Sequence, residues 1–171
     1  MPSSRRLSAA ATRYVAAVEL IDPASLAEAG VGLLLIDRDN TCVPRDTKVP
    51  PASVLAWLDD VRAAGIKVCL VSNNFHTDQV RRSAAELGCD AVDHAMKPAP
   101  FALERAMRQM GEDPERTVMV GDQVFTDVLA GNLAGVRTIL VRPQCRLDLW
   151  YTYIFRAFEH LALRGKKFEG E

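Results

Sequence analysis

The chain lacks several features that mark whole classes of proteins. It has no apolar run near the roughly 20 residues that a membrane-spanning helix needs, although 49% of its 171 residues are hydrophobic. Its formal net charge is only −1 and its pI is near 6.3, so it has no basic excess of the kind that nucleic-acid-binding proteins use. We therefore expect a soluble protein that binds no nucleic acid and that holds any anion in a local site.

Metal-binding patterns built on cysteine or histidine are also missing. The four cysteines, Cys42, Cys69, Cys89 and Cys145, include no Cys-x-x-Cys pair, and the three histidines show no metal-ligand spacing. We interpret the cysteines as reduced, structural thiols rather than zinc ligands or disulfides, and we expect a cytoplasmic location.

The length suits one compact domain, residues 1–171, with a single core. Residues 1–18 include three arginines and no acid, so a transit peptide is one interpretation. An ordinary first helix is the preferred one, because Arg13 and Tyr14 interrupt the apolar core that a secretory signal would need.

Turn residues divide the rest of the chain into alternating strands and helices. Apolar strands are expected at residues 31–36, 66–71, 91–95, 117–120 and 136–141. Helices are expected from Pro23 to about Gly30, at 52–64, at 77–87, from Pro98 to about Gly111, and at 124–133. This alternation predicts the α/β class, with a doubly wound, Rossmann-like parallel sheet of about five strands.

Four polar motifs follow apolar runs of this pattern. They are Asp37-Arg38-Asp39-Asn40-Thr41, Ser72-Asn73-Asn74, Lys97-Pro98 and Gly121-Asp122-Gln123-Val124-Phe125-Thr126-Asp127. In open parallel sheets, ligands bind at the carboxyl ends of the strands. The motifs therefore predict one shared pocket, whereas unrelated polar turns would be spread over both ends of the sheet.

The set and order of these motifs resemble the haloacid dehalogenase (HAD) superfamily of aspartate-nucleophile phosphatases. Within it, the motif forms look most like the YqeG family and the related mitochondrial-type phosphatidylglycerophosphatases. The resemblance covers roughly residues 14–142. It implies a HAD-like phosphatase domain that hydrolyses phosphomonoesters through a phospho-aspartate.

The resemblance assigns the chemistry to the first motif. Asp37 is expected to be the nucleophile that attacks phosphorus. Asp39 is expected to give a proton to the leaving group and later to take one from water. Thr41 either fixes the turn through its hydroxyl or is purely structural.

A divalent cation is also expected, because two aspartates and a phosphate dianion repel one another. Mg²⁺ suits hard oxygen ligands. As the resemblance implies, the ligands are the carboxylates of Asp37 and Asp122 and the backbone carbonyl of Asp39. Asp127 is expected behind them, orienting a water or Lys97. Its alternative role is that of an ordinary acid in the first turn of a helix.

The remaining motifs are assigned to the phosphoryl group. Ser72 and Asn73 are expected to donate hydrogen bonds to it, although Ser/Asn turns between strands and helices are common for structural reasons. Lys97 is expected to neutralise its charge. Arg38 departs from the YqeG pattern, which usually has an apolar residue there, and leaves the substrate preference open.

The spacing of the motifs leaves no room for a cap domain. Thr41 and Ser72 are 31 positions apart, and Ser72 and Lys97 are 25 apart. Each interval is filled by a loop, a helix and a strand, so we expect a capless site that is open unless another subunit covers it. Such a site suits a bulky phosphorylated substrate or one presented on a surface. The resemblance implies phosphatidylglycerophosphate, with its phospholipid head group, as the candidate.

Residues 149–163 predict a C-terminal amphipathic helix, with its apolar residues at helical spacing. They are Trp150, Tyr153, Ile154, Ala157, Phe158 and Leu161. Packing on the sheet or on a second subunit is the simplest explanation for this stripe. Peripheral contact with a membrane surface is the alternative.

Two other functions fit parts of the pattern. A receiver-like signalling module also combines a phospho-accepting aspartate, a Ser/Thr and a Lys-Pro. A catalytically silent HAD-like binding scaffold would share the fold. The acid at Asp39 and the carboxylate of Asp122, which comes late in the chain and which receivers lack, favour an enzyme with repeated turnover over a receiver.

Overall fold

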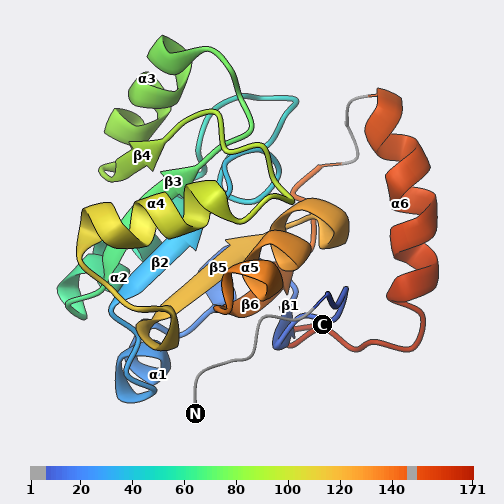
Figure 1. The fold of residues 1–171 in the computed structure, drawn as a ribbon, viewed down its shortest axis with the longest axis horizontal. Coiled ribbons are helices and arrows are strands. Elements are labelled where there is room, and N and C mark those ends of the chain that lie inside the picture. The colour runs from blue at the N-terminus through green and yellow to red at the C-terminus, as the bar shows by residue number, and fades with distance from the viewer. Residues whose placement is uncertain (1–6, 146–149) are drawn as a thin grey trace.

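The fold is a six-stranded, all-parallel sheet with helices on both faces (Figure 1). The computed structural model describes residues 7–145 and 150–171. The sheet order is β1-β6-β5-β2-β3-β4. The strands are β1 (Arg13–Val15), β2 (Leu33–Ile36), β3 (Lys67–Val71), β4 (Asp90–Val92), β5 (Thr117–Gly121) and β6 (Arg137–Val141).

The helices divide between the two faces of the sheet. They are α1 (Pro23–Glu28), α2 (Ala52–Ala63), α3 (Thr77–Leu87), α4 (Phe101–Met110), α5 (Leu129–Ala134) and α6 (Trp150–Ala162). Along β2, Leu34 and Ile36 pack with buried residues of α1, α2 and α3. Leu33 and Leu35 pack with those of α4 and α5 on the other face. Because successive side chains of a strand point to opposite faces, both halves of the core share β2.

The register of the sheet brings the ends of three strands to one level. Ile36 of β2 lies opposite Leu70 of β3 and Val120 of β5. The chain continues from those positions into the first, second and fourth polar motifs. From β2 the chain adds β3 and β4 on one side, and β5 and β6 then follow on the other side of β2. Doubly wound sheets bind their ligands at such a switch in strand order.

The predicted α/β class and parallel sheet are confirmed, with one strand more than expected. A helix was the preferred interpretation of the N-terminus, and this was wrong for its described part: Arg13–Val15 pair in parallel with β6. Only Val15 of this edge strand is fully buried, so it lacks the apolar run by which strands are recognised. Residues 1–6 lie outside the described part of the chain.

Two predicted helix ends are observed, and one predicted start is shifted. Asp22 caps α1, and its side chain accepts hydrogen bonds from the backbone N–H of Ala24 and Ser25 at 3.1 Å each. Gly88 ends α3 in the left-handed conformation, at φ 65°. α4 begins at Phe101 rather than at Pro98, which follows a cis peptide bond.

No cap domain interrupts the connections around the site. Residues 37–66, between β2 and β3, hold a loop and α2. Residues 72–89, between β3 and β4, hold a short loop and α3. In the described part of the chain, no helix is both long and apolar enough to cross a membrane.

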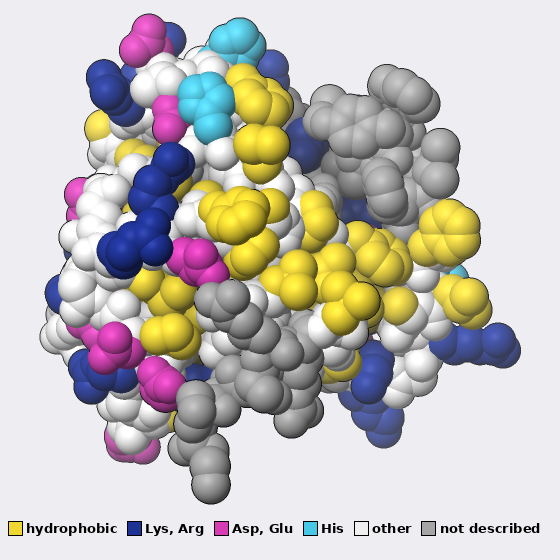
Figure 2. Space-filling model, in the orientation of Figure 1, with side chains coloured by type: hydrophobic (Ala, Val, Ile, Leu, Met, Phe, Trp, Pro, Cys, Tyr) yellow, Lys and Arg dark blue, Asp and Glu magenta, His cyan; other side chains and the backbone are white. Residues whose placement is uncertain are grey.

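The C-terminal helix stands apart from the two layers, beyond the β1 edge of the sheet (Figure 1). The predicted apolar stripe of α6 is exposed where its side chains are described: 61% of Phe158 and 68% of Leu161 are accessible. Figure 2 shows hydrophobic side chains on the surface at the C-terminal end of this helix. Packing of these two residues on the sheet is therefore not observed. The side chains of Trp150, Tyr153 and Ile154 lie outside the described ones.

Candidate active site

The loop after β2 folds back on itself and presents the two aspartates of the first motif. The backbone N–H of Asp37 donates to the carbonyl of Val120, at 3.0 Å, and so continues the sheet. Asn40 is buried with φ 60°, and its N–H donates to the carbonyl of Val43 at 2.8 Å. Asn is among the few residues other than glycine that enter this left-handed region readily. The sequence therefore encodes the tight turn.

Lys97 occupies the centre of the site. Its Nζ lies 2.7 Å from Oδ1 of Asp37 and 2.7 Å from Oδ1 of Asp127, and its side chain is only 2% exposed. A buried ammonium needs such partners, because desolvation of an unpaired charge is costly. Lys97 therefore links the carboxylate after β2 to the one after β5.

Asn73 fixes the backbone of that lysine. Its Oδ1 accepts from the N–H of Lys97 at 2.8 Å, and its Nδ2 donates to the carbonyl of Lys97 at 3.2 Å. We expected Asn73 to bind phosphate. The contacts observed position the lysine, and phosphate binding by Asn73 stays a prediction.

Three carboxylates form a compact acidic cluster at this edge of the sheet. Asp37, Asp122 and Asp127 each offer an oxygen atom within 4.8 Å of the others. Oδ2 of Asp127 also accepts from the backbone N–H of Gln123 at 3.1 Å. A Cβ at Gly121 would lie 2.2 Å from Cγ of Asp127, so the close approach of Asp127 requires glycine there.

Burial governs the protonation of the cluster. It raises the pKa of Asp37 to about 7, against the opposing effect of Lys97. It also raises the pKa of Asp122, against the opposing effect of Arg156. Burial alone lowers the pKa of Lys97, but Asp127 and Asp37 outweigh it and the net pKa is raised. The lysine is therefore a permanent cation, whereas Asp37 and Asp122 need a further positive charge to stay ionised.

Asp39 lies beside the acidic cluster rather than in it. Its carboxylate is 38% exposed and pairs with Arg38 at 2.7 Å and with Arg45 at 3.6 Å. It lines the same groove, about 540 Å³ in volume, as Asp37 and Lys97. This exposed position suits a group that exchanges protons with a leaving group and with water.

The two predicted hydroxyls reach different parts of the site. Thr41 is buried, and its Oγ1 donates to Oδ1 of Asp122 at 3.3 Å. Oγ of Ser72 accepts from the backbone N–H of Asn74 at 3.1 Å and borders the groove. Thr41 thus holds a carboxylate of the cluster, while Ser72 lies at the groove where a ligand would bind.

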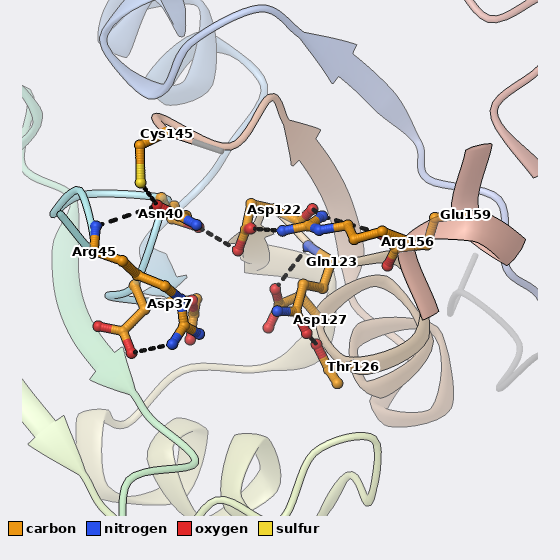
Figure 3. Close-up of polar contacts among 12 residues, drawn as sticks. Asp37, Asn40, Arg45, Asp122, Gln123, Thr126, Asp127, Cys145, Arg156 and Glu159 are labelled. Carbon is orange, nitrogen blue, oxygen red and sulfur yellow. Dashed lines mark hydrogen bonds and ion pairs between the residues drawn. The ribbon is translucent and has the colours of Figure 1, made fainter. Parts of the chain in front are cut away.

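Sequence reasoning missed two residues of α6 that reach the site, Arg156 and Glu159 (Figure 3). Arg156 forms an ion pair with Oδ2 of Asp122, and its Nη1 donates to the carbonyl of Asp122 at 2.7 Å. Oε1 of Glu159 accepts from the N–H of Val124 at 2.6 Å. The polar side of the helix therefore docks on the loop after β5.

A family comparison agrees with this geometry. The family model of haloacid dehalogenase-like hydrolases matches residues 6–135. The chain belongs to this family.

Among the haloacid dehalogenase-like hydrolases, the chain is similar to proteins that are named as phosphatases. The chain is 37% identical over 150 residues to "Probable phosphatase YqeG" of Bacillus subtilis strain 168, covering 88% of this chain and 87% of the relative. It is 27% identical to the phosphatidylglycerophosphate phosphatase 1 of Arabidopsis thaliana, covering 75% of this chain but only 39% of that protein. A crystal structure from Listeria monocytogenes serotype 4b shares the fold, with TM-score 0.56, 19% identity and coverage of 77% of this chain and 99% of that one.

The donor set of this hydrolase fits a divalent cation of the magnesium type. The cluster supplies carboxylate oxygens, the ligands that Mg²⁺ prefers, and it contains no sulfur or imidazole donor. Its three carboxylates face two buried or half-buried cations, Lys97 and Arg156. Glu159 also pairs with Arg156, at 3.0 Å. With every carboxyl ionised, four carboxylates face these two cations and leave two negative charges, which a divalent ion would balance.

Proposed function

We propose that the protein is a Mg²⁺-dependent phosphomonoester hydrolase that acts through a phospho-Asp37 intermediate. The observation that carries this proposal is the cluster of Asp37, Asp122 and Asp127, two of which, Asp37 and Asp127, pair with Lys97. The HAD-like family match and the phosphatases among the relatives support the same reaction class.

In the first step, a carboxylate oxygen of Asp37 attacks phosphorus while the bond from phosphorus to the leaving oxygen breaks. Asp39 gives its proton to that oxygen, so an alcohol departs. Lys97 stabilises the negative charge on the phosphoryl oxygens and holds the nucleophile in place. The Ser72 hydroxyl donates to one of those oxygens.

In the second step, water attacks the phosphorus of the acyl phosphate. Asp39, now a carboxylate, takes a proton from the water. The bond between phosphorus and Asp37 breaks, and inorganic phosphate leaves.

The carboxylates of Asp37 and Asp122 and the carbonyl of Asp39 would hold the Mg²⁺. When bound, the ion neutralises charge on the phosphate and keeps Asp37 ionised. Asp127 stays with Lys97 and Gln123, which use both of its oxygens, and so fits the expected supporting role.

The absence of a cap suits a bulky substrate, and the relative from Arabidopsis suggests phosphatidylglycerophosphate as one candidate. We place the protein in the cytoplasm, with its exposed Phe158 and Leu161 available for peripheral contact with a membrane surface or for a second copy of the chain.

A hydrolase assay tests the proposal directly. The protein with Mg²⁺ should turn over p-nitrophenyl phosphate many times, and a screen of lipid, sugar and nucleotide monoesters should identify better substrates. Asp37→Asn and Asp39→Asn should lose activity, whereas Asp60→Asn, an exposed position on α2, should keep it. A receiver-like module would be labelled once and stop, and a silent scaffold would release no phosphate at all. Either result would refute the proposal.

A further inference from the structure

A second groove, about 660 Å³ in volume, lies next to the proposed site, and basic side chains outnumber acidic ones in its lining. We call it the basic groove. Its charged lining comprises Arg38, Arg45, Lys48 and Arg82 as cations and Asp39 and Glu86 as acids.

The basic groove is continuous with the catalytic groove that holds Asp37 and Lys97. Asp39, Arg45 and Ser72 line both. A ligand that occupies the catalytic groove can therefore extend past Asp39 into the basic one. Because the two grooves share these lining residues, they adjoin each other directly.

The positive charge here is a local feature. The whole chain has a formal net charge of −1, yet this groove has four basic and two acidic side chains among its lining. One of those acids, Asp39, already pairs with two of the cations, Arg38 and Arg45. The groove therefore retains an excess of positive charge beside a site for a phosphate dianion.

The cations differ in how firmly they are held. The guanidinium of Arg38 pairs with Asp39, while its buried Nε has no hydrogen-bond partner among the described residues. Arg82 is exposed on α3, where its Nε donates to the carbonyl of Asp78 at 3.3 Å. Lys48 is exposed in the loop before α2. Guanidinium groups bind phosphate oxygens in a two-pronged geometry.

We propose that the basic groove binds a second anionic group of the substrate, a phosphate or phosphodiester joined to the scissile phosphate by a short spacer. This inference rests on the proposed phosphatase function. It narrows the substrate class to phosphomonoesters that carry at least one further phosphate-type anion.

Binding of a second anion also affects Asp39. A phosphate that pairs with Arg38 and Arg45 competes with Asp39 for these partners. The carboxyl is then freer to turn toward the leaving oxygen, so the second anion promotes both binding and proton transfer.

A matched pair of sugar phosphates separates this inference from the phosphatase function itself. Fructose bisphosphate and fructose monophosphate are compared with Mg²⁺ present, and p-nitrophenyl phosphate serves as the reference substrate. The second phosphate should raise kcat/KM at least about tenfold, the effect expected for one charge-assisted contact. This preference should weaken as salt screens the groove.

Two exposed lining residues provide the variants. Arg82→Gln and Lys48→Gln should each lower the ratio of bisphosphate to monophosphate kcat/KM several-fold. Arg81→Gln is the matched control, because Arg81 precedes Arg82 on α3 and is exposed but does not line the groove. It should leave the ratio unchanged.

Binding to the Asp37→Asn protein gives a readout that does not depend on turnover. Calorimetry should show that it binds fructose bisphosphate about tenfold more tightly than fructose monophosphate, and that Arg82→Gln removes much of the difference. Equal affinities, or a preference insensitive to Arg82 and Lys48, would overturn the inference. Hydrolysis of p-nitrophenyl phosphate would still uphold the phosphatase function in that case.

Discussion

Arg156 binds Asp122 through both its carboxylate and its backbone carbonyl. The two residues belong to a helix outside the core and to the loop after the central strand β5. The guanidinium of Arg156 thus pairs with Oδ2 of Asp122, a proposed metal ligand, while Thr41 donates to Oδ1 of the same carboxylate. Arg156 and Mg²⁺ are therefore expected to compete for Asp122.

The first prediction concerns this competition. Arg156→Gln should bind Mg²⁺ more tightly than the native protein, by about threefold to tenfold, because one cation is removed from a shared carboxylate. Calorimetric titration with Mg²⁺ measures the effect. Arg164→Gln, an exposed change just beyond α6, should have no effect. Equal or weaker Mg²⁺ binding by Arg156→Gln would show that the arginine supports the site instead.

Lys97 provides a prediction about stability. Lys97→Ala leaves Asp37 and Asp127 buried without their shared cation, which should cost about 3 to 5 kcal/mol of unfolding free energy. Urea denaturation measures this loss. Lys67→Ala removes an exposed lysine paired with Glu112 at 3.0 Å and should cost less than about 1 kcal/mol. Similar losses for the two variants would contradict the central role of Lys97.

Gly121 provides a prediction about geometry. Gly121→Ala should push Asp127 away from Lys97, because the new methyl group would overlap the carboxylate, and kcat/KM should fall about a hundredfold. Gly32→Ala is the matched control. Its Cβ meets only the flexible ends of Glu112 and Arg116, far from the site. An active Gly121→Ala enzyme would argue against a fixed role for Asp127.

Asp37 provides a prediction about how the unfolding free energy depends on pH. It applies to the metal-free protein, kept so by a chelator in the buffer. The pKa of Asp37 is raised by burial to about 7 in the folded state, against about 3.9 when unfolded. The folded protein therefore holds a proton that the unfolded chain has lost, and stability falls as pH rises through this window.

Between pH 5 and 8, the native protein should accordingly lose about 1 to 3 kcal/mol more unfolding free energy than Asp37→Asn. Urea midpoints of both proteins at the two pH values give this difference. Parallel pH profiles would mean that Asp37 is not buried as the structure indicates.

The sheet and the position of the site were predictable because each depends on local patterns. The apolar runs before Asp37 and Asp122 mark buried parallel strands, and polar turns at their carboxyl ends must converge once the strands are neighbours. β1 escaped prediction because an edge strand of three residues, Arg13–Val15, buries too little to show an apolar run.

Contacts between distant segments were not predictable. Asn73 binds the backbone of Lys97, and no spacing rule anticipates this pairing across 24 residues. Arg156 was overlooked because the hydropathy pattern of α6 draws attention to its apolar stripe. The side that docks on the site is the polar one, and only the tertiary arrangement shows it.

Trapping of the covalent intermediate tests the central claim most directly. The protein is mixed with Mg²⁺ and p-nitrophenyl phosphate, quenched during turnover and treated with borohydride, which reduces an acyl phosphate to an alcohol. Peptide mass spectrometry should then find homoserine in place of aspartate at position 37. Steady turnover with no modification there, or with modification at a different aspartate, would contradict the account.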